Sequence, residues 1–138
     1  MNWYLKVLKQ YADFKGRARR KEFWMFLLFH YIIAALLVFL LFFSAGGFEE
    51  GQEPSMIVIA VLVLYVLATI VPSIAVTVRR LHDIGKSGSW YFISFIPYIG
   101  GFWLLILTCM DSENKPNKWG ENPKGIGNDS VINQIGRE

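Results

Sequence analysis

The hydrophobic residues of the chain are gathered into three long runs, and most of the charged residues lie outside them. The runs cover residues 23–43, 56–78 and 90–110, and none contains Asp, Glu, Lys or Arg. As α-helices they would be roughly 31–35 Å long, which matches a hydrocarbon core about 30 Å thick. A buried helix of a soluble protein needs far fewer consecutive apolar residues. The pattern therefore predicts an all-α membrane protein with three transmembrane helices.

The third run contains residues that interrupt helices, namely Pro97, Gly100 and Gly101. Two arrangements are open. We expect a kinked but complete span, because lipid-exposed non-helical backbone is not tolerated in a bilayer. A re-entrant hairpin is the alternative, and it would return residues 111–138 to the side of the membrane from which the run starts.

The first 22 residues form a basic, amphipathic segment. Large apolar side chains recur along it, mostly at spacings of three and four: Trp3, Val7, Leu8, Tyr11 and Phe14. Such a helix is suited to the cytoplasmic membrane interface, although packing back on the bundle fits the pattern almost as well. Residues 111–138 are rich in Asn, Gly, Lys and Pro, which predicts a polar tail that is largely disordered after about residue 123.

The distribution of basic residues predicts the orientation. Residues 1–22 contain seven Lys and Arg and residues 79–89 contain three, whereas residues 44–55 contain none and residues 111–138 contain four. Lys and Arg near the spans face the cytoplasm. We therefore expect a cytoplasmic N-terminus, with residues 44–55 and the tail on the opposite side.

Basic residues from two segments should meet at the cytoplasmic surface as a basic collar. Its candidate lipid- or phosphate-binding members are Arg17, Arg19, Arg20, Lys21, Arg79, Arg80 and Lys86, with Lys15 beside them. On a continuing helix Arg79 and Asp83 are four residues apart, which predicts a structural ion pair with His82 on the same side. The collar then has two interpretations, an orientation signal with an ion pair or a site for anionic lipid headgroups.

Other candidate chemistry is sparse. Gly85-Lys86-Ser87 lacks the earlier glycine and the strand of a phosphate-binding loop. His30, His82 and Cys109 do not have metal-ligand spacing. We expect His30, inside the first span, to be a neutral imidazole bonded to a neighbouring helix, although an intramembrane histidine is also a functional candidate.

Hydroxyl groups share one face of the second span, at Tyr65, Thr69, Ser73 and Thr77. Small hydroxylated residues let membrane helices approach and hydrogen-bond each other. This face is predicted to join neighbouring helices.

Several segments resemble one family of bacterial inner-membrane proteins. Residues 14–24 read FKGRARRKEFW, residues 79–83 read RRLHD, residues 86–88 read KSG, and residues 96–100 and 117–123 continue the pattern. They resemble the YhaH-like family, domain of unknown function 805, with departures at Ser89, Trp119 and Glu121. The resemblance implies a location in the bacterial inner membrane. The activity of that family is undefined, so no catalytic residues can be transferred.

These observations predict a non-enzymatic membrane component without cofactor or bound metal. Through the collar it would bind anionic phospholipid or a protein partner. We do not expect it to bind nucleic acid. The alternative is a subunit of an oligomeric small transporter or channel, since three helices alone are too few to enclose a polar path.

Overall fold

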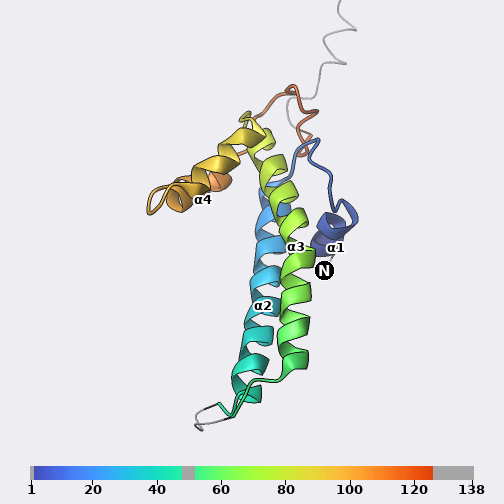
Figure 1. The fold of residues 1–138 in the computed structure, drawn as a ribbon. Coiled ribbons are helices and arrows are strands. Elements are labelled where there is room, and N and C mark those ends of the chain that lie inside the picture. The colour runs from blue at the N-terminus through green and yellow to red at the C-terminus, as the bar shows by residue number, and fades with distance from the viewer. Residues whose placement is uncertain (1, 48–51, 126–138) are drawn as a thin grey trace, which may run out of the picture.

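The computed structural model describes residues 2–47 and 52–125, and the regular elements of that part are helices. In chain order they are α1 Asn2–Lys9, α2 Arg20–Ser44, α3 Met56–Asp83, the 3₁₀ helix η1 Gly88–Phe95, and α4 Gly100–Cys109. Figure 1 shows α2 and α3 as a long antiparallel pair, with the other helices gathered toward one end.

Helices α2 and α3 are each long and apolar enough to cross a membrane. Only 6% and 11% of their most apolar stretches are buried within the molecule. Large side chains such as Leu36, Phe39 and Leu64 are more than half exposed. In a soluble protein such helices would be buried in a core, so this exposure is accounted for by lipid. The first two predicted spans thus form helices suited to a bilayer.

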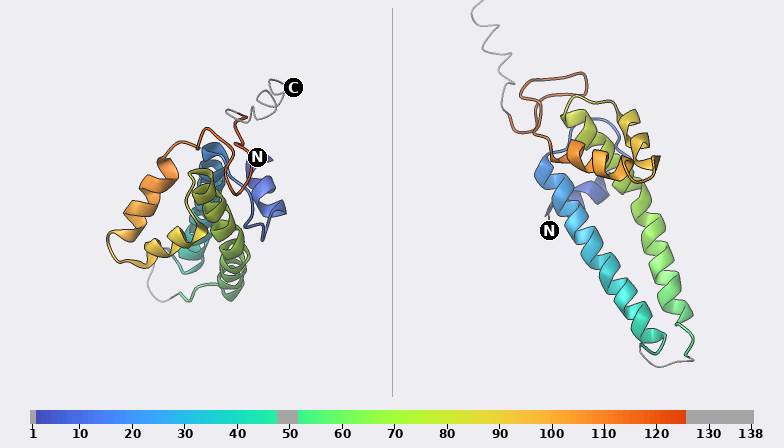
Figure 2. Two further views of the ribbon diagram at one scale, coloured as in Figure 1. Left: turned by 90° about the horizontal axis from the view of Figure 1, so that it is seen from above. Right: turned by 90° about the vertical axis from the view of Figure 1, so that its left-hand side faces the viewer.

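The third apolar run turns back on itself and does not form the kinked but complete span that was expected, so that prediction is wrong. Helix η1 ends at Phe95, the chain turns through Pro97 and Tyr98, and α4 begins at Gly100. Tyr98 has a φ of 67°, a backbone conformation that residues other than Gly rarely adopt. The chain reverses its direction at this residue. The two halves form a hairpin that leaves the end of α3 sideways, as both figures show (Figures 1 and 2). The hairpin alternative is the one that the structure adopts.

The hairpin returns to its starting point. The amide of Glu113 donates to the carbonyl of Asp83 over 2.9 Å. Residues 111–125 therefore lie at the same end of α3 as the collar, which contradicts the expectation that the tail lies at the opposite end. Most of the segment predicted to be disordered, residues 126–138, lies outside the described residues.

Helix α1 packs against the α2–α3 pair. Val7 is fully buried in a small apolar core with Phe23, Phe26 and Val76. Tyr4 stacks on Phe26 with the ring centroids 5.3 Å apart. This matches the alternative in which the amphipathic segment packs on the bundle. The side chain of Trp3 lies outside the described residues.

Candidate functional site

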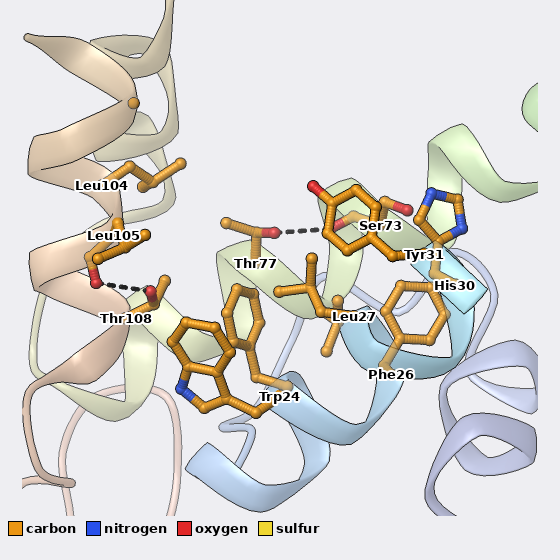
Figure 3. Close-up of a pocket in the computed structure, with 13 residues that line it drawn as sticks. Trp24, Phe26, Leu27, His30, Tyr31, Ser73, Thr77, Leu104, Leu105 and Thr108 are labelled. Carbon is orange, nitrogen blue, oxygen red and sulfur yellow. Dashed lines mark hydrogen bonds between the residues drawn. The ribbon is translucent and has the colours of Figure 1, made fainter. Parts of the chain in front are cut away.

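A groove of about 290 Å³ lies between α2, α3 and α4 (Figure 3). The hairpin supplies one wall of it through Leu104 and Leu105, and α2 supplies the facing wall through Trp24 and Leu27. Ser73 and Thr77 lie along it on α3. The groove is thus mainly apolar, with a few hydroxyl groups.

The polar residues beside this groove are only partly those expected to join helices. Tyr65 of α3 lies 2.9 Å from the Nδ1 of His30 on α2, which confirms the predicted bond between His30 and a neighbouring helix. Thr69 and Thr77 instead donate to carbonyls one turn earlier in α3 itself. The predicted hydroxyl face therefore joins the two helices through Tyr65, while Ser73 and Thr77 line the groove.

The end of α3 is closed by a glycine. Gly85 has a φ of 75°, and its amide donates to the carbonyl of His82 over 3.1 Å. The amide of Lys86 donates to the carbonyl of Leu81 over 2.9 Å. This pair of bonds is the Schellman arrangement of a helix C-terminus. The Gly-Lys-Ser sequence is thus a helix cap and not a phosphate loop.

Two distant segments add hydrogen bonds to carbonyls in the last turns of that helix. The amide of Ala18 donates to the carbonyl of Arg79 over 3.0 Å. From the tail, Asn117 Nδ2 donates to the carbonyl of His82 over 2.9 Å, next to the bond from Glu113. Asp83 is the last residue of α3, where a helix leaves carbonyls without intrahelical partners, and Glu113 supplies a donor to it. The motif around residues 79–83 is therefore the point at which the N-terminal loop, α3 and the tail are joined.

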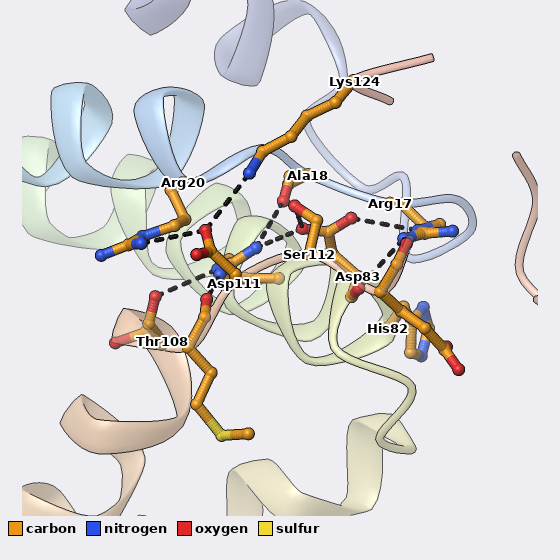
Figure 4. Close-up of polar contacts among 12 residues, drawn as sticks. Arg17, Ala18, Arg20, His82, Asp83, Thr108, Asp111, Ser112 and Lys124 are labelled. Carbon is orange, nitrogen blue, oxygen red and sulfur yellow. Dashed lines mark hydrogen bonds and ion pairs between the residues drawn. The ribbon is translucent and has the colours of Figure 1, made fainter. Parts of the chain in front are cut away.

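Asp83 is the centre of this junction and is completely buried (Figure 4). Its carboxylate accepts from Arg17 Nε at 3.0 Å, from Ser112 Oγ at 2.5 Å, and from Arg80 Nη1. The side chains of both arginines are at most 1% exposed. A buried carboxylate is costly unless it is paired and hydrogen-bonded. Here three donors from three segments satisfy that requirement.

The two arginines also bind backbone carbonyls. Arg17 donates to the carbonyls of Glu113 at 2.7 Å and Lys115 at 2.8 Å. Arg80 donates to the carbonyls of Thr108 and Met110 at the end of α4. Cations are favoured at helix C-termini, and Arg80 lies where the C-termini of α3 and α4 meet. The two arginines thus join the N-terminal loop, the end of α3, the end of α4 and the tail.

Arg79 belongs to a second buried cluster. It pairs with Glu22 at 3.3 Å and donates to Gln10, while Lys6 pairs with the other oxygen of Glu22 at 2.6 Å. The predicted pair of Arg79 with Asp83 is therefore not formed. Spacing along one helix suggested it, but Glu22 comes from α2 and lies on the side of α3 that Arg79 faces.

His82 is not part of an ion pair either. Its Nδ1 lies 3.2 Å from the carbonyl of Gly16, and its ring stacks on Trp119 with the centroids 4.4 Å apart. The ring thus helps to hold the tail against the N-terminal loop.

Six of the seven predicted binding residues fall into two groups, and Lys86 stands apart from both. Arg17, Arg79 and Arg80 are buried, whereas Arg19 and Lys21 are exposed and Arg20 is partly exposed. Lys86 lies over the ring of Trp90, 5.1 Å from its centroid. The exposed group lines a hollow together with residues of the tail. We name it the basic hollow; its residues are Arg19, Arg20, Lys21, Asp111 and Lys124.

Asp111 is the acid of the basic hollow. It accepts from Arg20 Nη1 at 3.0 Å and from Lys124 Nζ at 3.2 Å (Figure 4). These two hydrogen bonds, first that from Arg20, hold the pKa of the Asp111 carboxyl below its usual range. Within the described residues, Arg19 and Lys21 form no ion pair. The hollow thus carries four bases against one acid.

Sequence reasoning gave no role to Glu22, Ser112 or Lys124. Glu22 could have been noticed, because it is a lone acid inside a run of bases beside an apolar span, and such an acid is favoured only if it is paired. Ser112 and Lys124 carry no comparable signal, since their roles follow from the hairpin that brings the tail back.

Comparisons with known proteins agree with this picture of a small membrane protein. Residues 11–121 match the family described as Protein of unknown function (DUF805). The Escherichia coli inner membrane protein YhaI is 40% identical over 124 residues, 90% of this chain and 97% of that protein. Inner membrane protein YhaH of the same organism is 40% identical over 124 residues, 90% of this chain and 98% of that protein. No solved structure matches the chain significantly. The match and the two relatives together place this chain in the DUF805 family, which has inner-membrane members.

Proposed function

We propose that the chain is a non-enzymatic component of the bacterial inner membrane that binds anionic lipid headgroups in the basic hollow. The observation that carries this proposal is the division of the collar. Each of its buried arginines is paired with an internal acid, while Arg19, Arg20, Lys21 and Lys124 face a common space. Clustered bases at the end of a membrane helix attract anionic headgroups by about 1 kcal/mol per base.

We further propose that the collar faces the cytoplasm. The contacts of the tail strengthen the charge argument, because every basic residue of the described chain then lies at the collar end. The connection between α2 and α3 contains no Lys or Arg. With Lys and Arg favouring the cytoplasmic side, this asymmetry supports two crossings and a hairpin that enters and leaves on the cytoplasmic side.

Native mass spectrometry with retained lipid tests the headgroup proposal. The double variant Arg19→Gln/Lys21→Gln removes two bases that have no ion pair in the described chain. Its matched control, Lys9→Gln/Lys15→Gln, removes two exposed bases outside the hollow. Removing two bases at about 1 kcal/mol each should weaken binding of phosphatidylglycerol roughly 30-fold. The control should bind as the wild type does.

Phosphatidylcholine, whose headgroup has no net charge, serves as the comparison lipid. Added salt should weaken phosphatidylglycerol binding, because exposed charges are screened. Equal phosphatidylglycerol retention by the hollow variant and its control would refute the proposal. The same spectra report the number of chains in each particle, which tests the oligomeric alternative.

A further inference from the structure

The groove between α2, α3 and α4 and the basic hollow are neighbours. Arg20 of the hollow and Trp24 of the groove are four residues apart on α2, so they lie on the same face of that helix. On the facing side, Thr108 lines the groove at the end of α4, and Asp111 lines the hollow three residues later. The bond between Arg20 and Asp111 joins the two sides at this point.

The groove has the size and chemistry of a site for a hydrocarbon chain. Its volume of about 290 Å³ is near the lower end of ligand pockets. Figure 3 shows Trp24 beside Thr108, with Leu104 and Leu105 farther along α4. From this end the groove runs away from the charges, toward Tyr31 and Ser73. A molecule that fills both places must be charged at one end and apolar at the other.

We infer that the chain holds one anionic phospholipid, with its phosphate in the basic hollow and an acyl chain in the groove. The inference rests on the proposed headgroup function and adds a defined place for the chain. The charge of the hollow decides between occupants. Four bases and one acid at the mouth favour an anionic lipid over a zwitterionic lipid or an apolar helix of a partner.

Asp111 then competes with the lipid. Without lipid, its carboxylate occupies Arg20 and Lys124. A lipid phosphate would displace the carboxylate and accept hydrogen bonds from Arg20 and Lys124 instead. Both residue types bind phosphate, and arginine can do so through two parallel hydrogen bonds. The bond between Asp111 and Arg20 therefore lies where the basic hollow meets the groove, and a bound lipid would have to break it.

Gly101 allows the groove to be filled without a clash. It lines the groove, and a Cβ at this position would meet no atom within 4 Å. Gly101→Trp should fold, because there is room for the side chain and because tryptophan has a higher helix propensity than glycine. Leu36→Trp is the matched control, since Leu36 is 58% exposed on the lipid-facing surface of α2 and lies outside the groove.

The experiment measures binding of phosphatidylglycerol to delipidated protein by native mass spectrometry. Two lipids share one headgroup: dipalmitoyl phosphatidylglycerol and its dihexanoyl analogue. We expect Gly101→Trp to bind the dipalmitoyl lipid roughly tenfold more weakly, because a few methylene groups lose their burial. Leu36→Trp should bind it as the wild type does. Equal binding of the dihexanoyl lipid to all three proteins would show that Gly101→Trp is folded and keeps the hollow.

The outcomes separate the inference from the function on which it rests. Unchanged dipalmitoyl binding by Gly101→Trp, together with a loss in Arg19→Gln/Lys21→Gln, would overturn the acyl-chain site and leave the headgroup site standing. Unchanged binding by Arg19→Gln/Lys21→Gln would overturn both. A loss of dihexanoyl binding in Gly101→Trp would also count against the inference, since that lipid is too short to need the groove.

Discussion

Replacement of Asp83 by alanine tests whether the buried junction stabilises the fold. The change removes a fully buried carboxylate and leaves Arg17 and Arg80, both at most 1% exposed, without their acidic partner. Breaking a buried ion pair by removing one partner costs about 3–5 kcal/mol. Ser112 also loses its acceptor, which places the expected loss in the upper part of that range.

Asp111→Ala is the matched control. Asp111 also lies between two bases, Arg20 and Lys124, but its side chain is 72% exposed. Exposed ion pairs contribute little because water screens both charges. Unfolding free energies of the two variants, measured by denaturant titration in mixed micelles, should therefore differ by several kcal/mol. Equal losses would refute the reasoning, because they would mean that burial does not set the strength of the contact.

Arg17→Lys should destabilise the fold more than Arg19→Lys, because an ammonium cannot replace a guanidinium that donates to five acceptors. Unfolding temperatures in detergent compare the two, and equal values would contradict the joining role of Arg17. Gly100→Ala should disrupt the hairpin while Gly101→Ala should not, because a Cβ at position 100 would lie 1.9 Å from the carbonyl oxygen of Ile93. Hydrogen exchange over residues 88–109 measures this, and similar protection in both variants would count against the observed turn. In a Cys109→Ala background, cysteines at Lys15 and Lys118 should react with a membrane-impermeant reagent from one side and a cysteine at Gly47 from the other. Labelling of position 118 together with position 47 would exclude the hairpin topology. Arg20→Gln should raise the pKa of Asp111, measured by NMR titration, because it removes the main hydrogen bond that lowers it. The pKa of Asp111 is lower in the folded chain than in the unfolded chain. The contact therefore stabilises the fold at pH values above the usual carboxyl pKa, and this stabilisation is lost as the pH falls through the lowered pKa. An unchanged pKa in Arg20→Gln would show that the contact is absent in solution.

The sequence was sufficient for the two long helices and not for the hairpin. Length and apolarity decide whether α2 and α3 can span a bilayer. Both properties follow from the sequence of each run alone, without knowledge of its tertiary contacts. The break in the third run depends on a contact, the close approach of Gly100 to Ile93. Pro97 and the two glycines showed where a break could occur. They could not show that the chain reverses there, since Tyr98 adopts a conformation that its residue type does not suggest.

The site shows the same division. The sequence identified the basic residues of the collar but not their partners. Local spacing favoured Asp83 for Arg79, yet Asp83 pairs with Arg80 three residues away and with Arg17, 66 residues away in the chain. Which arginines remain exposed follows from how the N-terminal loop and the tail wrap around α3. For that reason the basic hollow, with Lys124 in it, became visible only in three dimensions.

The return of the tail to Asp83 has a consequence for biosynthesis. Glu113 and Ser112, which bind Asp83, are synthesised about 30 residues after it, a delay of roughly 2–6 s at the usual rates of translation. During that interval α2 and α3 are already complete, and the partners of Arg17 in the tail do not yet exist. The nascent chain must therefore enter the membrane with its charged junction unfinished. The junction can be completed only when residues 111–117 have left the ribosome and reach the end of α3.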